Sequence, residues 1–210
     1  MKRRYAVRVA AGAAAVFGAA IAYAYSGGPP ASRTGAPQEL MCDDCHSGYP
    51  LNTGGSVSVL DAPPFYRAGS TYPIRVRLES SQTAGMSGRV WGFELTAVRV
   101  SDGVGAGIFS NVTGQGTRTL SGSGSFSTRR YIEHSSSGTR AAATSPVEWN
   151  VQWTAPNPGV GAVRFHASGL AADGTGDESG DWVYSFNSAM GDSATPAVRT
   201  TWGRVKADRR

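Results

Sequence analysis

The residues best suited to chemistry lie together in the run Cys42-Asp43-Asp44-Cys45-His46, which holds both cysteines of the chain. The pattern Cys-x-x-Cys-His is the attachment signature of c-type haem. Two thiols at this spacing can each form a thioether with the same porphyrin, and the adjacent imidazole then becomes the proximal ligand of the iron. The motif therefore predicts one haem c, with Cys42 and Cys45 bound to the porphyrin and His46 to the iron.

Two other interpretations of this motif stay open. A Cys42–Cys45 disulfide fits the same spacing, although a thioredoxin-like site would need a helix where Gly48 and Pro50 follow. A zinc site would use the thiolates and one or two histidines, but the chain has no second cysteine pair to complete the usual four ligands. Haem is the interpretation that the spacing favours.

A sixth ligand to the iron would come from another histidine or from a methionine. His134 ends a strand-like run, so its imidazole could face a haem at the rim of the domain. We expect His134 to be the distal ligand, ahead of His166 and Met86. The alternative for either histidine is a partly exposed strand residue that makes an ordinary hydrogen bond. An open sixth position would favour small-ligand binding over electron transfer.

A second candidate site is the glycine-rich acidic loop over residues 173–181. Asp173, Asp177 and Asp181 could supply oxygen ligands to calcium. Their spacing does not match an EF-hand loop. Acidic turns before a strand also form because aspartate side chains accept hydrogen bonds from nearby backbone groups.

The N-terminal residues have the features of a secretory signal. Four basic side chains lie within residues 2–8, an uncharged Ala- and Val-rich run follows, and Ala22-Tyr23-Ala24 resembles a cleavage site. We predict a signal peptide over residues 1–24 and export to the periplasm, the cell envelope or the medium. Export agrees with the haem prediction, because bacteria attach c-type haem after translocation. An uncleaved segment 1–24 would be the one membrane anchor that we expect.

Charge argues against nucleic acid as a partner. The formal net charge is +5, and four of the basic residues lie in the predicted signal. Further basic residues gather in the tail, residues 188–210. A nucleic-acid-binding domain needs a basic face with aromatic side chains, which this distribution does not predict.

The rest of the chain has the pattern of a β protein. Residues 25–37 are rich in Gly, Pro, Ser and Ala, which predicts a flexible linker before a domain at 38–187. Short runs of alternating or β-rich character, bounded by turn residues, predict an antiparallel Ig-like β-sandwich with Trp149 and Trp153 in its core. The expected strands cover residues 56–60, 72–78, 90–100, 126–134, 147–153, 160–167 and 182–186.

Several stretches of the chain form an ordered set: 34–37 with 42–48, 91–97, 131–134, 149–156, and 161–169 with 180–184. Taken in this order, they resemble bacterial Reelin-type (Reeler) domains of exported proteins with varied anchors. The resemblance covers residues 34–187 and places His134 at a Tyr-x-x-His position. It implies a β-sandwich at the cell envelope but little about activity, because a fold does not fix a function.

The sequence contains no Gly-x-Ser-x-Gly elbow and no Walker-type or dinucleotide-binding loop. We therefore expect an exported mono-haem electron carrier, not an enzyme, that exchanges electrons with a redox partner protein in the cell envelope. The alternative is a non-catalytic envelope or adhesion module with a Cys42–Cys45 disulfide. A weaker alternative is a calcium- or metal-binding envelope protein.

Overall fold

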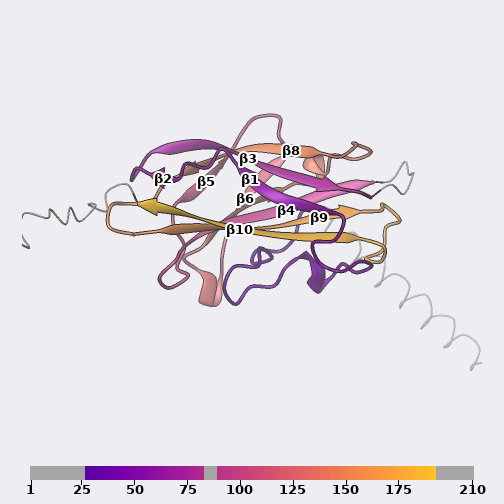
Figure 1. The fold of residues 1–210 in the computed structure, drawn as a ribbon, viewed down its shortest axis with the longest axis horizontal. Helices are drawn as coiled ribbons and strands as arrows, with labels where there is room; N and C mark the ends of the chain where they lie inside the picture. The colour runs from indigo at the N-terminus through magenta and orange to yellow at the C-terminus, as the bar shows by residue number, and fades with distance from the viewer. Residues whose placement is uncertain (1–26, 83–88, 193–210) are drawn as a thin grey trace, which may run out of the picture.

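Two β-sheets pack face to face in the computed structural model, which describes residues 27–82 and 89–192 (Figure 1). Within these residues, one sheet has four strands in the order β1-β3-β8-β5, and the other has six in the order β2-β10-β9-β4-β7-β6. The all-β sandwich predicted from the sequence is confirmed. The predicted signal peptide, Met86 and residues 193–210 lie outside the described residues.

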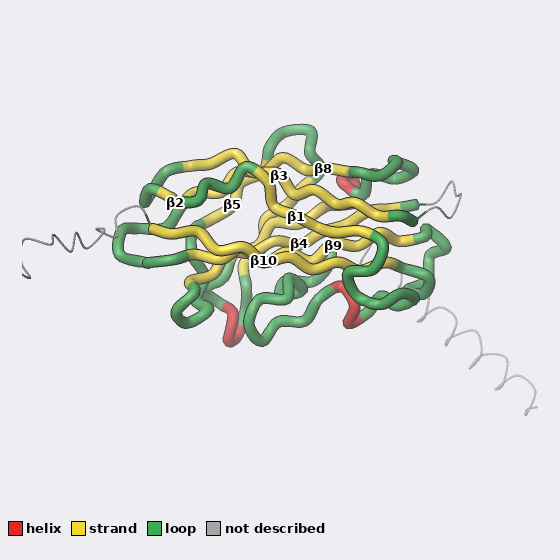
Figure 2. The backbone as a smooth tube through the Cα atoms, in the orientation of Figure 1, coloured by secondary structure: helices red, strands yellow, loops and turns green. Residues whose placement is uncertain are grey.

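Ten strands and three single helical turns make up the described part of the chain (Figure 2). The four-stranded sheet contains β1 (Gly55–Leu60), β3 (Thr71–Ser80), β5 (Ile108–Asn111) and β8 (Val147–Thr154). The six-stranded sheet contains β2 (Phe65–Tyr66), β4 (Val90–Arg99), β6 (Thr117–Ser121), β7 (Arg130–His134), β9 (Val163–Ala172) and β10 (Trp182–Asp192). The helical turns are η1 (Cys42–Asp44), η2 (Gly124–Phe126) and η3 (Ser136–Gly138). No helix in residues 27–82 or 89–192 has the length and apolar character needed to cross a membrane.

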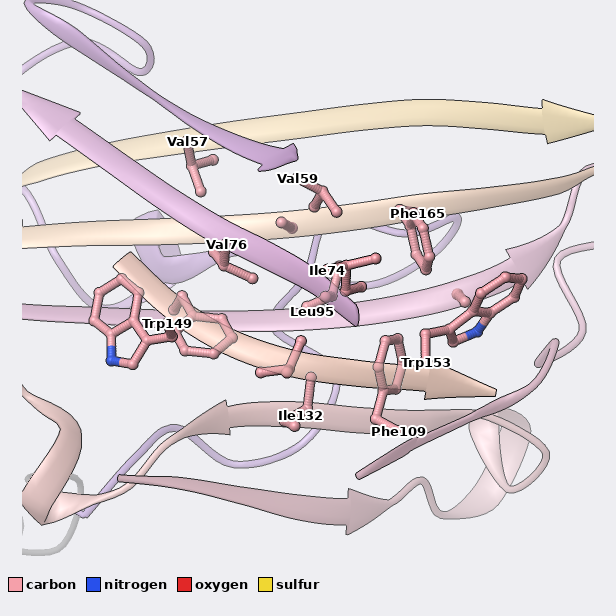
Figure 3. Close-up of a cluster of buried hydrophobic side chains, with 14 of the residues drawn as sticks. Val57, Val59, Ile74, Val76, Leu95, Phe109, Ile132, Trp149, Trp153 and Phe165 are labelled. Carbon is pink, nitrogen blue, oxygen red and sulfur yellow. The ribbon is translucent and has the colours of Figure 1, made fainter. Parts of the chain in front are cut away.

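The core lies between the sheets and follows from the alternation of side chains along each strand (Figure 3). In β8, every second side chain points inward, which places Trp149 and Trp153 in the core as predicted. Trp149 packs against Phe93, with ring centroids 4.7 Å apart, and Trp153 packs edge-on against Phe165 at 5.1 Å. Large buried rings of this kind contribute much of the hydrophobic stabilisation of a sandwich.

The strand prediction needs three corrections. The predicted domain boundary at 187 cuts through β10, which continues to Asp192. The sheets are not wholly antiparallel, because β2 pairs with β10 in parallel. Strands β2, β5 and β6 were not predicted, since they are short or largely exposed and lack a clear apolar alternation.

The prediction of a flexible linker over residues 25–37 is wrong for the residues that the structure describes. Residues 27–41, here called the N-terminal strap, lie against the outer face of the six-stranded sheet (Figure 1, indigo). The Arg33 N–H donates to Glu94 Oε2 of β4 at 2.5 Å, and Thr34 and Ala36 are buried. The small, polar composition gave no sign of this contact because the strap is held by polar groups on a distant strand.

Candidate functional site

The Cys-x-x-Cys-His motif begins where the N-terminal strap ends. Residues Cys42–Asp44 form η1, and the N–H groups of Cys45 and His46 both donate to the carbonyl of Cys42, at 3.3 and 2.9 Å. The Cys42 N–H donates to Ser168 Oγ of β9 at 3.1 Å. The motif is therefore a single tight turn that is fastened to the outer face of the six-stranded sheet.

His46 has a specific partner far along the chain. Its Nδ1 lies 2.6 Å from Oδ2 of Asp181, whose side chain is fully buried just before β10. The other carboxylate oxygen of Asp181 accepts the Asp173 N–H at 2.9 Å. Backbone contacts join the same two segments, because the Asp181 N–H donates to the Ser47 carbonyl at 2.8 Å. Asp181 therefore holds the imidazole of His46 in one orientation.

This contact makes Asp181 a site residue whose role the sequence analysis missed. The two residues are 135 positions apart, so no local spacing could reveal the pair. Asp181 was identified only as one of three candidate calcium ligands in the acidic loop. The only local sign of a special role for Asp181 was its position immediately before a strand. Many ordinary turn residues occupy such positions, so this sign was too weak to identify the contact with His46.

The acidic loop itself is organised as a series of turns. Asp173 Oδ1 accepts the N–H of Thr175 at 2.8 Å, and Asp177 Oδ1 accepts the N–H of Ser179 at 2.8 Å. Across the two described ranges, no three His, Cys, Asp or Glu side chains gather as a metal ion would require. The geometry thus gives no support to calcium at Asp173, Asp177 and Asp181, and that site stays a prediction.

The two cysteines differ in their surroundings. Both are free thiols, with Cys42 half-buried against the sheet and Cys45 exposed. Burial raises the pKa of the Cys42 thiol to about 12, so this group stays protonated at neutral pH. A protonated thiol reacts slowly both in disulfide exchange and in thioether formation. The raised pKa of Cys42 therefore does not separate the haem, disulfide and zinc interpretations of the motif.

His134, the predicted distal ligand, lies at the end of β7 with 9% of its surface exposed. Its Nδ1 is 3.1 Å from the Phe93 N–H and 3.2 Å from the Phe93 carbonyl oxygen, so either tautomer of the ring has a backbone partner. If Nδ1 of His134 donates to the Phe93 carbonyl, Nε2 of the same ring carries no proton and keeps a free lone pair. Burial lowers the pKa of His134 to about 4, and charges on Arg118 and His46 add to this effect.

The structure therefore brings His134 within electrostatic range of His46, but no contact joins them, and iron ligation by His134 stays a prediction. His166 is buried in β9, where burial lowers its pKa. The alternative of a partly exposed strand histidine with an ordinary hydrogen bond is wrong in its exposure for both His134 and His166, because both are buried, the latter under the N-terminal strap. Gly35 of the strap contributes a backbone hydrogen bond to the histidine.

Sequence reasoning also missed a group of buried acids beneath the strap. Glu39, Glu94 and Glu133, here called the strap carboxylates, have side chains with little or no exposure. Glu39 pairs with Arg129 at 2.5 Å, and Glu133 pairs with Arg118 at 2.5 Å. Burial raises the pKa of Glu133 to about 7 and that of Glu94 well above its usual range.

One oxygen on each of two strap carboxylates, Glu94 Oε1 and Glu133 Oε2, is buried without a hydrogen-bond partner. A carboxyl group in such surroundings favours its protonated form. Glu94 lies near enough to Cys42 to contribute to the raised pKa of that thiol. The strap carboxylates therefore lie between the N-terminal strap and the sheet, and Glu94 among them is close to Cys42, the first residue of the motif.

No family model matches the chain. No curated protein matches it either. Among solved structures, the chain is similar to the reeler domain of human F-spondin, with 21% identity, a TM-score of 0.40, and coverage of 70% of this chain and 92% of that one. It is also similar to a cohesin module from a Clostridium perfringens family 33 glycoside hydrolase, with 11% identity, a TM-score of 0.40, and coverage of 67% and 98%.

A conjugative transposon lipoprotein from Bacteroides eggerthii is similar at 13% identity and a TM-score of 0.32, covering 65% of this chain and 97% of that one. Each of these is a likeness in fold. Identities and TM-scores at this level carry no argument about family, ligand or activity. The functional argument therefore depends on the geometry of the site.

Proposed function

We propose that the chain is an exported electron carrier that holds one haem c at Cys42, Cys45 and His46. The observation that carries this proposal is the 2.6 Å contact between His46 Nδ1 and the buried carboxylate of Asp181. Histidines that bind metals usually donate their other ring N–H to a carboxylate or a carbonyl. A proton held on Nδ1 leaves the Nε2 lone pair of His46 free for iron.

The surrounding residues fit this role in two ways. The turn η1 brings Cys42 and Cys45 together on the sheet surface, where each thiol would form one thioether. Asp181 fixes the ring of His46 and increases its basicity, which favours the oxidised metal. When bound, the haem supplies a one-electron couple between ferric and ferrous iron.

A porphyrin bound at the motif would lie on the surface of the sandwich, because the described core is filled by side chains. The core is closed by large side chains such as Trp149 and Trp153, which are fully buried. An open hollow of about 430 Å³ lies at one end of the four-stranded sheet, and it includes no residue of the motif. Cys45 is exposed, so a group attached there would keep one edge open to a redox partner protein.

The test is to produce the chain together with a c-type haem attachment system and to measure its mass and its pyridine-treated spectrum after denaturation. The proposal predicts a c-type absorption band and a mass gain of one haem. A Cys42→Ser/Cys45→Ser double variant serves as the control and should remain colourless. A colourless wild-type protein would contradict the proposal.

A second candidate function is a non-catalytic envelope or adhesion module in which Cys42 and Cys45 form a disulfide. One observation favours it: the strap that leads into the motif is already fixed by the buried Glu39–Arg129 pair. A Cys42–Cys45 bridge across this turn would then fasten the motif in a purely structural role. In the same mass measurement, this module predicts a mass two protons below that of the reduced chain.

A further inference from the structure

An exposed aromatic patch lies beside the motif. Tyr49 is 47% exposed, and its ring stacks on that of Trp182, with centroids 3.7 Å apart and planes at 13°. Leu51, which is 37% exposed, follows two residues later. These three residues are here called the aromatic patch. Tyrosine and tryptophan are enriched at the centres of protein interfaces because they bury a large area with few rotatable bonds.

The patch is fixed in place by the segment that carries it. Gly48 pairs with Asp181, and the Asn52 N–H donates to the Val183 carbonyl at 3.0 Å. The segment over residues 48–52 therefore follows the start of β10. The backbone of Gly54 lies close to the ring of Trp182, because a Cβ at this position would be 2.7 Å from Cζ3 of that ring. A surface held this firmly loses little entropy when a partner binds.

Acidic side chains border the patch on the side of the motif. Asp43 and Asp44 are exposed in η1, and Asp177 and Glu178 are exposed in the acidic loop. The Ser47 N–H donates to the Glu178 carbonyl at 2.7 Å, which places Glu178 next to the segment that carries Tyr49. Arg33 pairs with Asp44 at 3.5 Å and offsets only one of these charges. The border is therefore negatively charged.

We propose that the aromatic patch with its acidic border is the docking surface for a redox protein that presents lysine and arginine side chains around its own cofactor. This inference rests on the proposed function. Tyr49 follows His46 by three residues, at most about 10 Å of extended chain, so a docked partner would lie close to the iron ligand. Opposite charges steer such partners into contact.

A second copy of this chain is a poorer occupant of the same surface. In a symmetric pair, the same patch would face itself, and the acidic borders of both copies would meet. Like charges brought together across an interface cost several kcal/mol. A partner with a basic face gains from the same border instead.

The experiment measures electron transfer from the reduced, haem-loaded protein to probes of opposite charge by stopped-flow absorption. The probes are tris(phenanthroline)cobalt(III), which is cationic, and ferricyanide, which is anionic. Between about 10 mM and about 200 mM salt, the rate with the cobalt complex should fall and the rate with ferricyanide should rise, because salt screens exposed charges. Glu178→Lys should lower the cobalt rate at low salt by roughly 3- to 10-fold.

Asp102→Lys is the matched control, because it makes the same change in charge at the opposite end of the six-stranded sheet. The strand register shows this separation. Trp182 lies level with Ala171 and Trp91, near the start of β4, whereas Asp102 follows the end of β4. This control should keep the cobalt rate within about 1.5-fold of wild type. Equal effects of Glu178→Lys and Asp102→Lys would overturn the docking surface.

A second variant tests the aromatic patch with a basic mono-haem cytochrome c as the protein probe. Tyr49→Ser should slow electron transfer to this cytochrome by at least roughly 3-fold, and by more than it slows transfer to ferricyanide, which has no aromatic surface. An unchanged rate with the cytochrome would overturn the role of the patch. The two failures are distinguishable, since a colourless protein overturns the proposed function as well, whereas a haem-loaded protein with insensitive rates overturns the docking surface alone.

Discussion

His46 and Asp181 form a side-chain contact between the haem-type motif and the start of β10. The ring nitrogen and the buried carboxylate lie 2.6 Å apart, although the two residues are separated by 135 positions in the chain. Asp181 accepts from His46 with one oxygen and from the Asp173 N–H with the other. The carboxylate therefore fixes both the tautomer of the histidine and the shape of the acidic loop.

Asp181→Asn should disturb His46 without preventing covalent attachment. The asparagine amide has one acceptor oxygen, so it can accept from either His46 or the Asp173 N–H. Its NH2 group would then face the other N–H donor, and the lost hydrogen bond costs roughly 1–3 kcal/mol. The reduction potential should rise, by about 60 mV for each tenfold loss of preference for ferric iron. Potentiometric titration measures this shift, and an unchanged potential with normal haem content would show that Asp181 does not tune His46.

His134→Ala should convert a low-spin haem spectrum to a high-spin one if His134 is the distal ligand. Removal of the imidazole would leave the iron without its sixth ligand. His166→Ala is the control, because it removes another buried histidine from β9, a strand of the same sheet that is separated from β7 by β4. Circular dichroism checks that both variants are folded. A low-spin spectrum that persists in His134→Ala would exclude this residue as the ligand.

Arg129→Met should destabilise the protein strongly by leaving the buried Glu39 carboxylate without its positively charged partner. The side chains of the pair are 6% and 0% exposed, and loss of one member of a buried ion pair costs about 3–5 kcal/mol. Denaturant unfolding measures the loss. Glu39→Gln/Arg129→Met, which removes both charges, should recover part of it.

Asp61→Asn serves as the surface control for Arg129→Met. It breaks the exposed pair with Arg75, and solvent-exposed ion pairs contribute little to stability. If Arg129→Met and Asp61→Asn cost the same free energy of unfolding, the strap is not held by the buried pair.

Glu94→Gln should make the folded protein less sensitive to rising pH. Burial raises the folded-state pKa of Glu94 above its ordinary value near 4.5. The stability that this carboxyl contributes is therefore complete below about pH 4.5 and is lost as the pH rises through the raised folded-state pKa. The glutamine mimics the protonated carboxyl and can still accept the Arg33 N–H.

The measurement is the melting temperature of both proteins from pH 5 to pH 8. The variant should melt higher than wild type at pH 8, by roughly 2–4 °C for each kcal/mol regained, and the difference should shrink toward pH 5. His134 titrates in the opposite sense, because its pKa is lowered, but both proteins share it. A constant difference across this range would contradict the raised pKa of Glu94.

Local patterns in the sequence predicted the sandwich and its core, but they did not predict the surroundings of the motif. The alternation in β3 and β8 identified the inward-facing side chains, including Trp149 and Trp153, because side-chain direction in a strand repeats every two residues. The same reasoning cannot find partners that depend on tertiary packing. The Arg33–Glu94 and His46–Asp181 contacts join segments 61 and 135 positions apart.

The strap shows most clearly why composition misled the prediction. Residues 27–41 contain the glycine, proline and serine that are typical of a linker, and only their burial against β4 and β9 shows that they are ordered. The acidic loop shows the same limit of local patterns. Its carboxylates predict a cation site, which stays a prediction, and the sequence did not reveal that Asp181 is directed to His46 and Asp177 to its own turn.

The most direct measurement of the central claim is the mass of the tryptic peptide over residues 34–67, which carries both cysteines and His46 and has no internal lysine or arginine. In protein made with a c-type haem attachment system, this peptide should carry the mass of one haem and retain it under reducing, denaturing conditions. The same peptide at its unmodified mass after reduction, or two protons lighter before it, would contradict the haem site and support the disulfide module.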